Sequence, residues 1–346
     1  MENKTKQNPF KKILAIRGMG QVITVACGLI ILCIVFGFLN PIFFSAQNVG
    51  NLLRQIAPIL IIGVGQSYVL ITGNIDLSIG SVVGMSCMIS ATLMTKGINP
   101  WVAVGITFLC CILVGVLNGQ LVAKCKLPPF IATLGTMTIA RGIAQIVNNN
   151  YNTDSIGDGA QAFRDFFYYG KFLGIYNTIW IAVVLWILFN FLLSKTRTGR
   201  HIYAIGSNVE ASRLSGVNVV SSTTKAYVVS SICACVVGLI ICATSGMGTM
   251  DAGNMYEMYA VAASVIGGVS TLGGQGILLG TVIGASIWGV LQNGLQFAGA
   301  PVAIRNIVIG IIVVISVLLD VVVRSGKPRK KKEKNVPEPK PSGVKA

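Results

Sequence analysis

Long apolar stretches alternate with short polar or glycine-rich segments along most of the chain. The apolar stretches lack the period-two alternation of membrane-barrel strands, and many are long enough for a helix to cross a bilayer. Since a bilayer offers no water to backbone groups, helices satisfy them best. The pattern predicts an all-α, polytopic transmembrane helical bundle of about ten spans. The predicted spans are residues 20–39, 54–72, 76–94, 101–123, 130–147, 177–194, 223–244, 257–267, 277–297 and 302–323.

Composition supports lipid as the main solvent of this chain. Hydrophobic residues make up 53% of it and charged residues only 11%, against about 25% charged residues in a soluble domain. We expect a basic N-terminal segment over 1–19, a membrane domain over 20–323, and a disordered basic tail over 324–346.

The net charge of +16 is concentrated at the two ends and in two loops. Basic residues follow the predicted fourth and sixth spans, whereas aspartates lie in loops of the opposite side. The positive-inside rule therefore predicts that both termini are cytoplasmic, and it accounts for the charge without nucleic-acid binding. The loop residues that set this orientation are Lys124, Lys126, Lys195, Arg197, Arg200 and Arg213 inside, and Asp154, Asp158, Asp165 and Asp251 outside.

Residues that commonly act in catalysis or bind metals are scarce in this sequence. His201 is the single histidine, and eight of the nine cysteines lie in apolar runs, where a thiol behaves as a small hydrophobe. The sequence contains no Walker A or HExxH motif and no Ser/His/Asp set that one face could hold. We therefore expect no catalytic residue, no metal site and no directly bound cofactor.

Polar residues in or beside the predicted spans are candidates for lining a solute path. Asp76 is the most prominent, because a carboxylate near hydrocarbon is costly unless it is paired or hydrated. The favoured interpretation of Asp76 is a cap of the following helix, which is compatible with a place on the path. The uncharged residues could equally hydrogen-bond between helices. The candidate path residues are Gln66, Asn74, Asp76, Thr133 and Asn293.

Two other features of the spans concern packing. Gly276, Gly280 and Gly284 recur every fourth residue, which predicts one helix face that another backbone can approach closely. Arg141 lies toward the outer part of the fifth predicted span. It either extends to the interface or pairs with Glu257 across the bundle.

The loop over 195–222 contains a second candidate site. The stretch 209–215 can form a short helix with Asn208 as its N-cap, Glu210 in its first turn and Gly216 as its stop, and it includes Ala211 and Arg213. A short polar helix on the cytoplasmic face suits docking of a soluble partner. An ordinary connector explains it equally well.

Several blocks in this order resemble the permeases of ribose-type monosaccharide ABC importers, the inner-membrane components of binding-protein-dependent transport. They are N-I-D-L-S-I-G-S at 74–81, F-I-A-T-L-G-T at 130–136, Y-A-I-G-S-N at 203–208, E-A-S-x-x-x-G at 210–216, G-G-V-S-T-L-G-G-Q-G at 267–276 and N-G-L at 293–295. The chain departs from the family pattern at Asn74, where glycine is usual, and at Tyr259, where an acidic residue is common.

The resemblance implies a bacterial cytoplasmic-membrane protein that forms the path for a monosaccharide such as ribose. A separate ABC ATPase subunit would dock at 208–216 and hydrolyse ATP, and an extracytoplasmic sugar-binding protein would deliver the sugar. A second permease copy, or a related permease, would complete the path. An ion-coupled carrier or channel is the alternative, although few acidic residues lie within the spans. A membrane-embedded enzyme is disfavoured by the missing catalytic residues.

Overall fold

The computed structural model describes residues 19–325, and its regular structure is almost entirely helical. The predicted basic segments 1–19 and 324–346 lie outside the described residues apart from their inner ends. The long helices and those of the predicted spans are α2 (Met19–Leu39), α3 (Ala46–Ile71), α4 (Ile79–Thr95), α5 (Pro100–Ala123), α6 (Pro129–Ile146), α8 (Asn177–Lys195), α11 (Val219–Ser245), α12 (Tyr256–Ile266), α13 (Leu278–Phe297) and α14 (Val302–Ser325).

Shorter elements connect these helices. They are η1 (Pro41–Phe44), η2 (Asp158–Ala160), α7 (Gln161–Arg164), the π-helix η3 (Asp165–Tyr169), the strands β1 (Lys171–Phe172) and β2 (Ile175–Tyr176), α9 (Arg197–Ser207) and α10 (Val209–Leu214). The two strands form an antiparallel hairpin in which Lys171 pairs with Tyr176.

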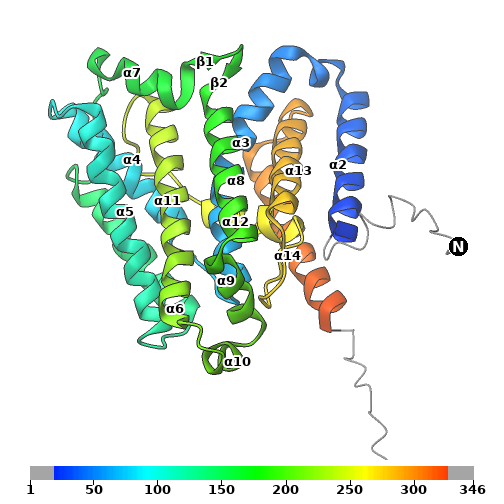
Figure 1. The fold of residues 1–346 in the computed structure, drawn as a ribbon. Coiled ribbons are helices and arrows are strands. Elements are labelled where there is room, and N and C mark those ends of the chain that lie inside the picture. Colours follow the sequence, from blue (N-terminus) through cyan, green and yellow to red (C-terminus); the bar gives the residue numbers. More distant parts are fainter. Residues whose placement is uncertain (1–18, 326–346) are drawn as a thin grey trace, which may run out of the picture.

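The interior of the bundle is built around α3 and α11. Helix α11 packs against α3, α4 and α5, and α12 lies between α3 and α13. Helices α2 and α14 lie at the periphery, where α2 packs on α13 and α14 on α12 (Figure 1). Every residue of α3 from Ile59 to Ile71 is buried. A helix that is apolar and buried all round belongs to the core of a bundle.

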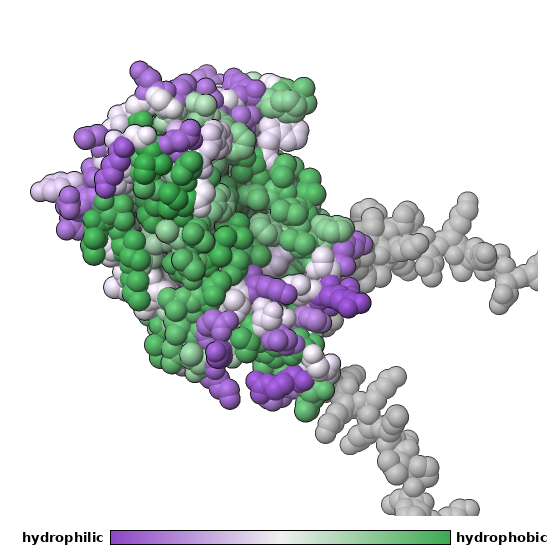
Figure 2. Space-filling view, turned by 60° about the vertical axis from the view of Figure 1, so that its left-hand side comes forward, coloured by the Kyte–Doolittle hydropathy of each residue, from purple (hydrophilic) through white to green (hydrophobic). Residues whose placement is uncertain are grey.

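The two ends of the bundle differ. Figure 1 places α7 and the β1–β2 hairpin at one end, called here the hairpin end, and α10 at the other, called the α10 end. A hydrophobic band covers the surface between hydrophilic groups at the two ends (Figure 2). Within the described residues, six helices are long and apolar enough to cross a membrane: α2, α3, α5, α8, α11 and α13. The molecule thus has the form of a multi-pass membrane protein.

A helix is present over each of the ten predicted spans. Helices α4 and α12 and the apolar part of α14 are shorter than the six spanning candidates. The structure therefore confirms the all-α bundle. Among the described residues, helix length and hydropathy support six membrane spans and not all of the ten predicted ones.

Some helices begin at other residues than predicted. Helix α3 begins at Ala46 rather than near residue 54, because the Oγ of Ser45 accepts the backbone N–H of Asn48 at 3.3 Å and caps it. Helix α4 begins at Ile79 rather than at Asp76. The intervening residues form an irregular break between α3 and α4.

The two predicted polar loops are also more ordered than expected. The segment 148–176 contains η2, α7, η3 and the β hairpin. The segment 195–222 contains α9 and α10, and α11 already begins at Val219, since the Oδ1 of Asn218 accepts the backbone N–H of Ser221 at 2.9 Å. Local caps therefore extend helices into segments whose polar composition suggested loops.

Candidate functional site

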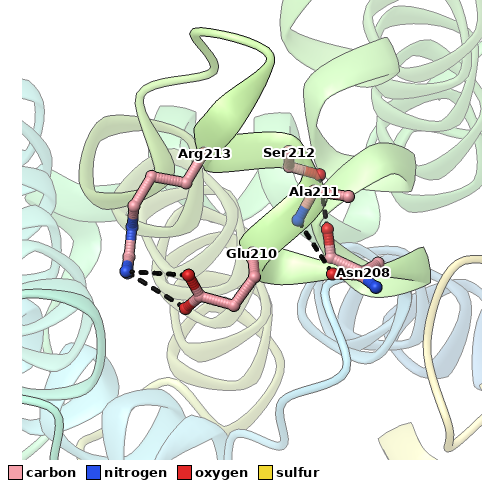
Figure 3. A network of polar contacts seen from close by, with 5 residues as sticks. All are labelled: Asn208, Glu210, Ala211, Ser212 and Arg213. Carbon is pink, nitrogen blue, oxygen red and sulfur yellow. Dashed lines mark hydrogen bonds and ion pairs between the residues drawn. The ribbon is translucent and has the colours of Figure 1, made fainter.

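The short helix α10 lies at one end of the bundle (Figure 1). Asn208 caps it, because its Oδ1 accepts the backbone N–H of Ala211 at 2.9 Å (Figure 3). At the other end Gly216 has a φ of 81°, and its N–H donates to the carbonyl of Arg213 at 3.0 Å. A left-handed glycine after the last turn is a common helix stop. The predicted helix, its cap and its stop are all present.

The outer face of α10 is charged. Glu210 and Arg213 form an ion pair of 3.1 Å, with side chains 73% and 52% exposed (Figure 3). Such an exposed pair stabilises little and leaves both groups available to a partner. Ser212 faces inward instead: it is buried, and its Oγ donates to the carbonyl of Asn208 at 2.7 Å.

Helix α9, which was not predicted, holds α10 against the bundle. Ile202 and Ile205 form its buried face. The Oη of Tyr203 donates to the carbonyl of Gly276 at 2.6 Å. Burial raises the pKa of Tyr203 to about 12. This hydrogen bond ties α9 to the loop between α12 and α13.

Three chain segments meet backbone to backbone beside α9, in a cluster called here the glycine junction (Gly73, Gly206, Gly273 and Gly274). The N–H of Gly274 donates to the carbonyl of Ile71, the last residue of α3, at 2.8 Å. A Cβ on Gly206 would overlap that same carbonyl, and one on Gly273 would lie 2.8 Å from the Cα of Gly73. Side chains are thus excluded where the end of α9 touches the end of α3 and the α12–α13 loop.

The junction was not among the predicted site residues. The density of glycines over 267–276 and the Y-A-I-G-S-N block were the available signals. What the sequence lacks is any sign that these two segments meet each other and the end of α3. The contacts join positions at least 67 residues apart, the separation of Gly206 and Gly273, so a local pattern cannot reveal them.

A cavity of about 600 Å³ opens beside α10. It lies between the α3–α4 break, the α5–α6 loop, α10 and the start of α11. Asn74 and the predicted α10 residues Asn208, Glu210 and Arg213 line it, together with Lys126. The structure therefore brings one predicted path residue next to the predicted docking residues.

Asp76 lies at the centre of a buried hydrogen-bond network. Its Oδ1 accepts the backbone N–H and the hydroxyl of Ser78 at 2.9 and 2.6 Å, and its Oδ2 accepts the hydroxyl of Ser230 on α11 at 2.7 Å. The Nδ2 of Asn118 on α5 donates to the Ser78 hydroxyl at 2.9 Å, and Thr136 on α6 donates to the Oδ1 of Asn118 at 2.6 Å. The network joins the α3–α4 break to α5, α6 and α11.

This arrangement corrects the expectation that Asp76 caps the next helix. Ser78 is the residue at the N-cap of α4, and Asp76 precedes it by two positions. The carboxylate is 1% exposed, and each of its oxygens accepts at least one hydrogen bond. Buried charges persist where hydrogen bonds replace the lost water. Asp76 thus joins the break between α3 and α4 to α11.

The other candidate path residues are dispersed. Gln66 on α3 is fully buried, and neither of its amide atoms has a hydrogen-bond partner among the described residues. Thr133 on α6 is buried and donates to the carbonyl of Pro129 at 2.8 Å. Asn293 on α13 exchanges two amide hydrogen bonds with Asn48 on α3, at 3.0 and 3.2 Å. The structure does not gather the predicted path residues around one cavity.

The predicted glycine face is present only in part. Cβ atoms on Gly280 and Gly284 would overlap the backbone of Gly267 and Ala263 on α12, so α12 and α13 are in backbone contact there. Gly276 does not share this face. It precedes α13, which begins at Leu278, and has a φ of 144°. The spacing of four is meaningful only inside a helix, and the helix begins later than expected.

Arg141 on α6 forms no ion pair with Glu257 in the structure. Its Nη1 donates to the carbonyls of Met250 and Ala252, each at 2.9 Å. Both carbonyls belong to the turn between α11 and α12. The guanidinium therefore orders a turn in place of a pair with Glu257.

Apolar helices of spanning length around buried polar contacts define an integral membrane protein. In agreement, residues 48–317 match the family model described as "Branched-chain amino acid transport system / permease component". The chain belongs to this family of transport-system permeases. The family description alone does not settle the solute.

Individual relatives are named for sugars. The ribose import permease protein RbsC of Bacillus subtilis is 36% identical over 295 residues, which cover 85% of this chain and 90% of the relative. The D-allose transport system permease protein AlsC of Escherichia coli is 33% identical over 297 residues, covering 84% and 89%. The galactose/methyl galactoside import permease protein MglC of Haemophilus influenzae is 34% identical over 300 residues, covering 81% and 88%. No solved structure matches the chain.

Proposed function

We propose that this chain is the membrane permease of an ABC importer for a monosaccharide in the bacterial cytoplasmic membrane. The supporting observation is that relatives named for ribose, allose and galactose import align along about nine-tenths of their own length. The sugar is a neutral polyhydroxylated solute of the ribose, allose or galactose type. The chain provides the path, and a separate ABC subunit hydrolyses ATP.

The proposed topology has ten spans and cytoplasmic termini, with the α10 end inside. Charge supports this orientation, because the loops of the α10 end carry lysines and arginines, whereas those of the hairpin end carry aspartates that Arg164 and Lys171 balance only in part. The end of α14 lies toward the α10 end, as an even number of spans requires if the start of α2 is also inside (Figure 1).

The proposed docking element for the ATPase is α10. An ATPase without its own membrane anchor needs a protruding, rigid contact on the permease, and α10 is capped at both ends and charged on its outer face. Through α9 and the glycine junction, a displacement of α10 would reach the end of α3 and the α12–α13 loop. Tight backbone contacts transmit such a movement because no flexible side chain intervenes.

The remaining proposed partners lie outside the bilayer and beside the chain. A sugar-binding protein delivers the solute at the hairpin end. A second permease, either identical or related, supplies the other half of the path. Exposed apolar side chains along α14 suit contact with lipid or with this second permease; they include Ile304, Ile307, Ile311, Val314, Ile315 and Leu318.

The experiment is uptake of radiolabelled ribose, allose and galactose into proteoliposomes that contain the permease with its ATPase and binding protein. We expect uptake of at least one sugar that requires ATP inside and both partner proteins. Uptake without the ATPase, driven by a proton or sodium gradient, would favour the ion-coupled carrier instead.

A further inference from the structure

A second cavity, of about 470 Å³, lies toward the hairpin end of the bundle. It is called here the outer cavity, and it is lined by the N-terminal half of α3, the last turns of α11, the C-terminal half of α13, the start of α12, η3 and α14. Its volume falls in the range of small-molecule sites. It lies on the side from which the solute of an importer enters.

The outer cavity is lined by polar groups that the chain itself leaves unsatisfied. Within residues 19–325, the Nε1 of Trp288 and the Nε atoms of Arg54 and Arg305 are buried without a hydrogen-bond partner. The side-chain amides of Gln55 and Gln292, which also line it, form no hydrogen bond to another described residue. A buried donor without a partner costs about 1–3 kcal/mol. Gln55 is exposed and Gln292 is half-buried, so their side-chain amides are open to a ligand in the cavity.

Aromatic contacts hold the principal groups in place. The ring of Trp288 lies 4.7 Å from that of Tyr259, which lies 5.6 Å from Tyr256. The guanidinium of Arg54 is sandwiched between the rings of Tyr168 and Tyr176, at 3.9 and 4.0 Å. Side chains fixed in this way lose little freedom when a ligand arrives.

The chemistry of the lining suits a sugar ring. Trp288 and Tyr256 offer aromatic surface for the C–H groups of the ring, and the amides of Gln55 and Gln292 both donate to and accept from hydroxyls. Arg54 and Arg305 add N–H donors. Among the described residues that line the cavity none is acidic, which disfavours a cationic solute. We propose that the outer cavity is a binding site for a neutral monosaccharide on its way into the permease.

This inference rests on the proposed import of a monosaccharide, and its test separates the two. Trp288→Phe removes the N–H and keeps an aromatic ring, and Gln292→Leu removes the amide at similar volume. The matched control is Trp101→Phe, because Trp101 is exposed on α5 and packs on Phe166, away from the outer cavity. Each variant is reconstituted with the ATPase and binding protein, and sugar taken up is measured per ATP hydrolysed.

We expect Trp288→Phe and Gln292→Leu to lower uptake per ATP about tenfold, the upper range for one lost hydrogen bond. Binding-protein-stimulated ATP hydrolysis should persist, since α10 is untouched, and Trp101→Phe should match the wild type. Wild-type uptake per ATP in both cavity variants would overturn the inference and leave the proposed function standing. Failure of the wild type to import any sugar would overturn both.

A direct measurement of sugar binding distinguishes loss of the site from misfolding of a variant. Replacing Trp101, Trp180 and Trp186 by Phe leaves Trp288 as the only tryptophan. The imported sugar should change the emission of Trp288 saturably, and Gln292→Leu should raise the sugar concentration needed for half of the change about tenfold. D-galacturonate, with the ring of galactose and an added carboxylate, is the comparison. A saturable response to galacturonate alone would refute a neutral sugar as the ligand, and no response to any sugar would refute the site.

Discussion

Replacement of Gly216 by Val should disconnect the permease from its ATPase. Gly216 has a φ of 81°, and a Cβ built there meets no atom of the described residues within 4 Å, so the cost comes from the backbone conformation and not from a clash. A left-handed residue with a Cβ costs about 1–2 kcal/mol. That corresponds to about a 5- to 30-fold loss in the population of the native turn.

The turn also holds two hydrogen bonds that close α10. They run from the N–H groups of Gly216 and Val217 to the carbonyls of Arg213 and Ser212, both at 3.0 Å. If the turn opens, these bonds exchange with water and the charged face of α10 is no longer held in one orientation. We expect Gly216→Val to lower ATPase co-purification and ATP-dependent uptake about tenfold, while the yield of inserted permease stays near that of the wild type.

Gly97 provides a matched control. It follows α4 with a φ of 79°, and nothing lies within 4 Å of a Cβ built on it. Gly97→Val therefore carries a similar backbone cost in a different loop, the turn before α5. We expect it to leave ATPase capture unchanged. Equal loss of capture in the two variants would indicate a general folding defect and refute a special role for α10, and equal retention would make α10 a simple connector.

Three further predictions address topology, packing and the buried network. Single cysteines at Arg200 and Asp158 should react with impermeant reagent from opposite sides of the membrane, and labelling of both from one side would contradict the proposed topology. Gly284→Leu should lower the folded yield severalfold, because the new side chain would meet the backbone of α12. Gly28→Leu is the control and should keep the yield, because no atom of the described residues lies within 4 Å of a Cβ at Gly28. Equal yields of the two variants would exclude the close α12–α13 contact. Asp76→Ala should lower the free energy of unfolding of the detergent-solubilised permease by about 1–3 kcal/mol, because it leaves the buried hydroxyls of Ser78 and Ser230 without their acceptor. An unchanged melting temperature would remove Asp76 from the structural core.

Local chemistry was sufficient to predict α10 from the sequence. The cap by Asn208 and the stop at Gly216 act within a few residues of each other, so the sequence pattern contains all the interacting partners. The same reasoning applied to Ser45 and Asn218 would have placed the starts of α3 and α11 correctly. Lipid as the solvent also follows from the sequence, because hydrophobicity summed over a helix-length segment does not depend on its neighbours.

Partners distant along the chain depend on the tertiary structure alone. Asp76 binds Ser230, Asn48 exchanges bonds with Asn293, and Arg141 selects two carbonyls in place of a carboxylate. Several side chains of suitable chemistry compete for each such bond, and the packing of α3 against α11 and α13 selects among them.

Contacts between backbones are still less visible in the sequence. Gly206 meets the end of α3, and Gly276 lies outside the helix whose face it was expected to share. A glycine has no side chain, so its chemistry does not indicate which residue it will contact. The sequence thus determined the class of the molecule, the approximate positions of its helices and the short helix α10. The tertiary structure decided which segments touch, because close packing depends on distances that no local pattern contains.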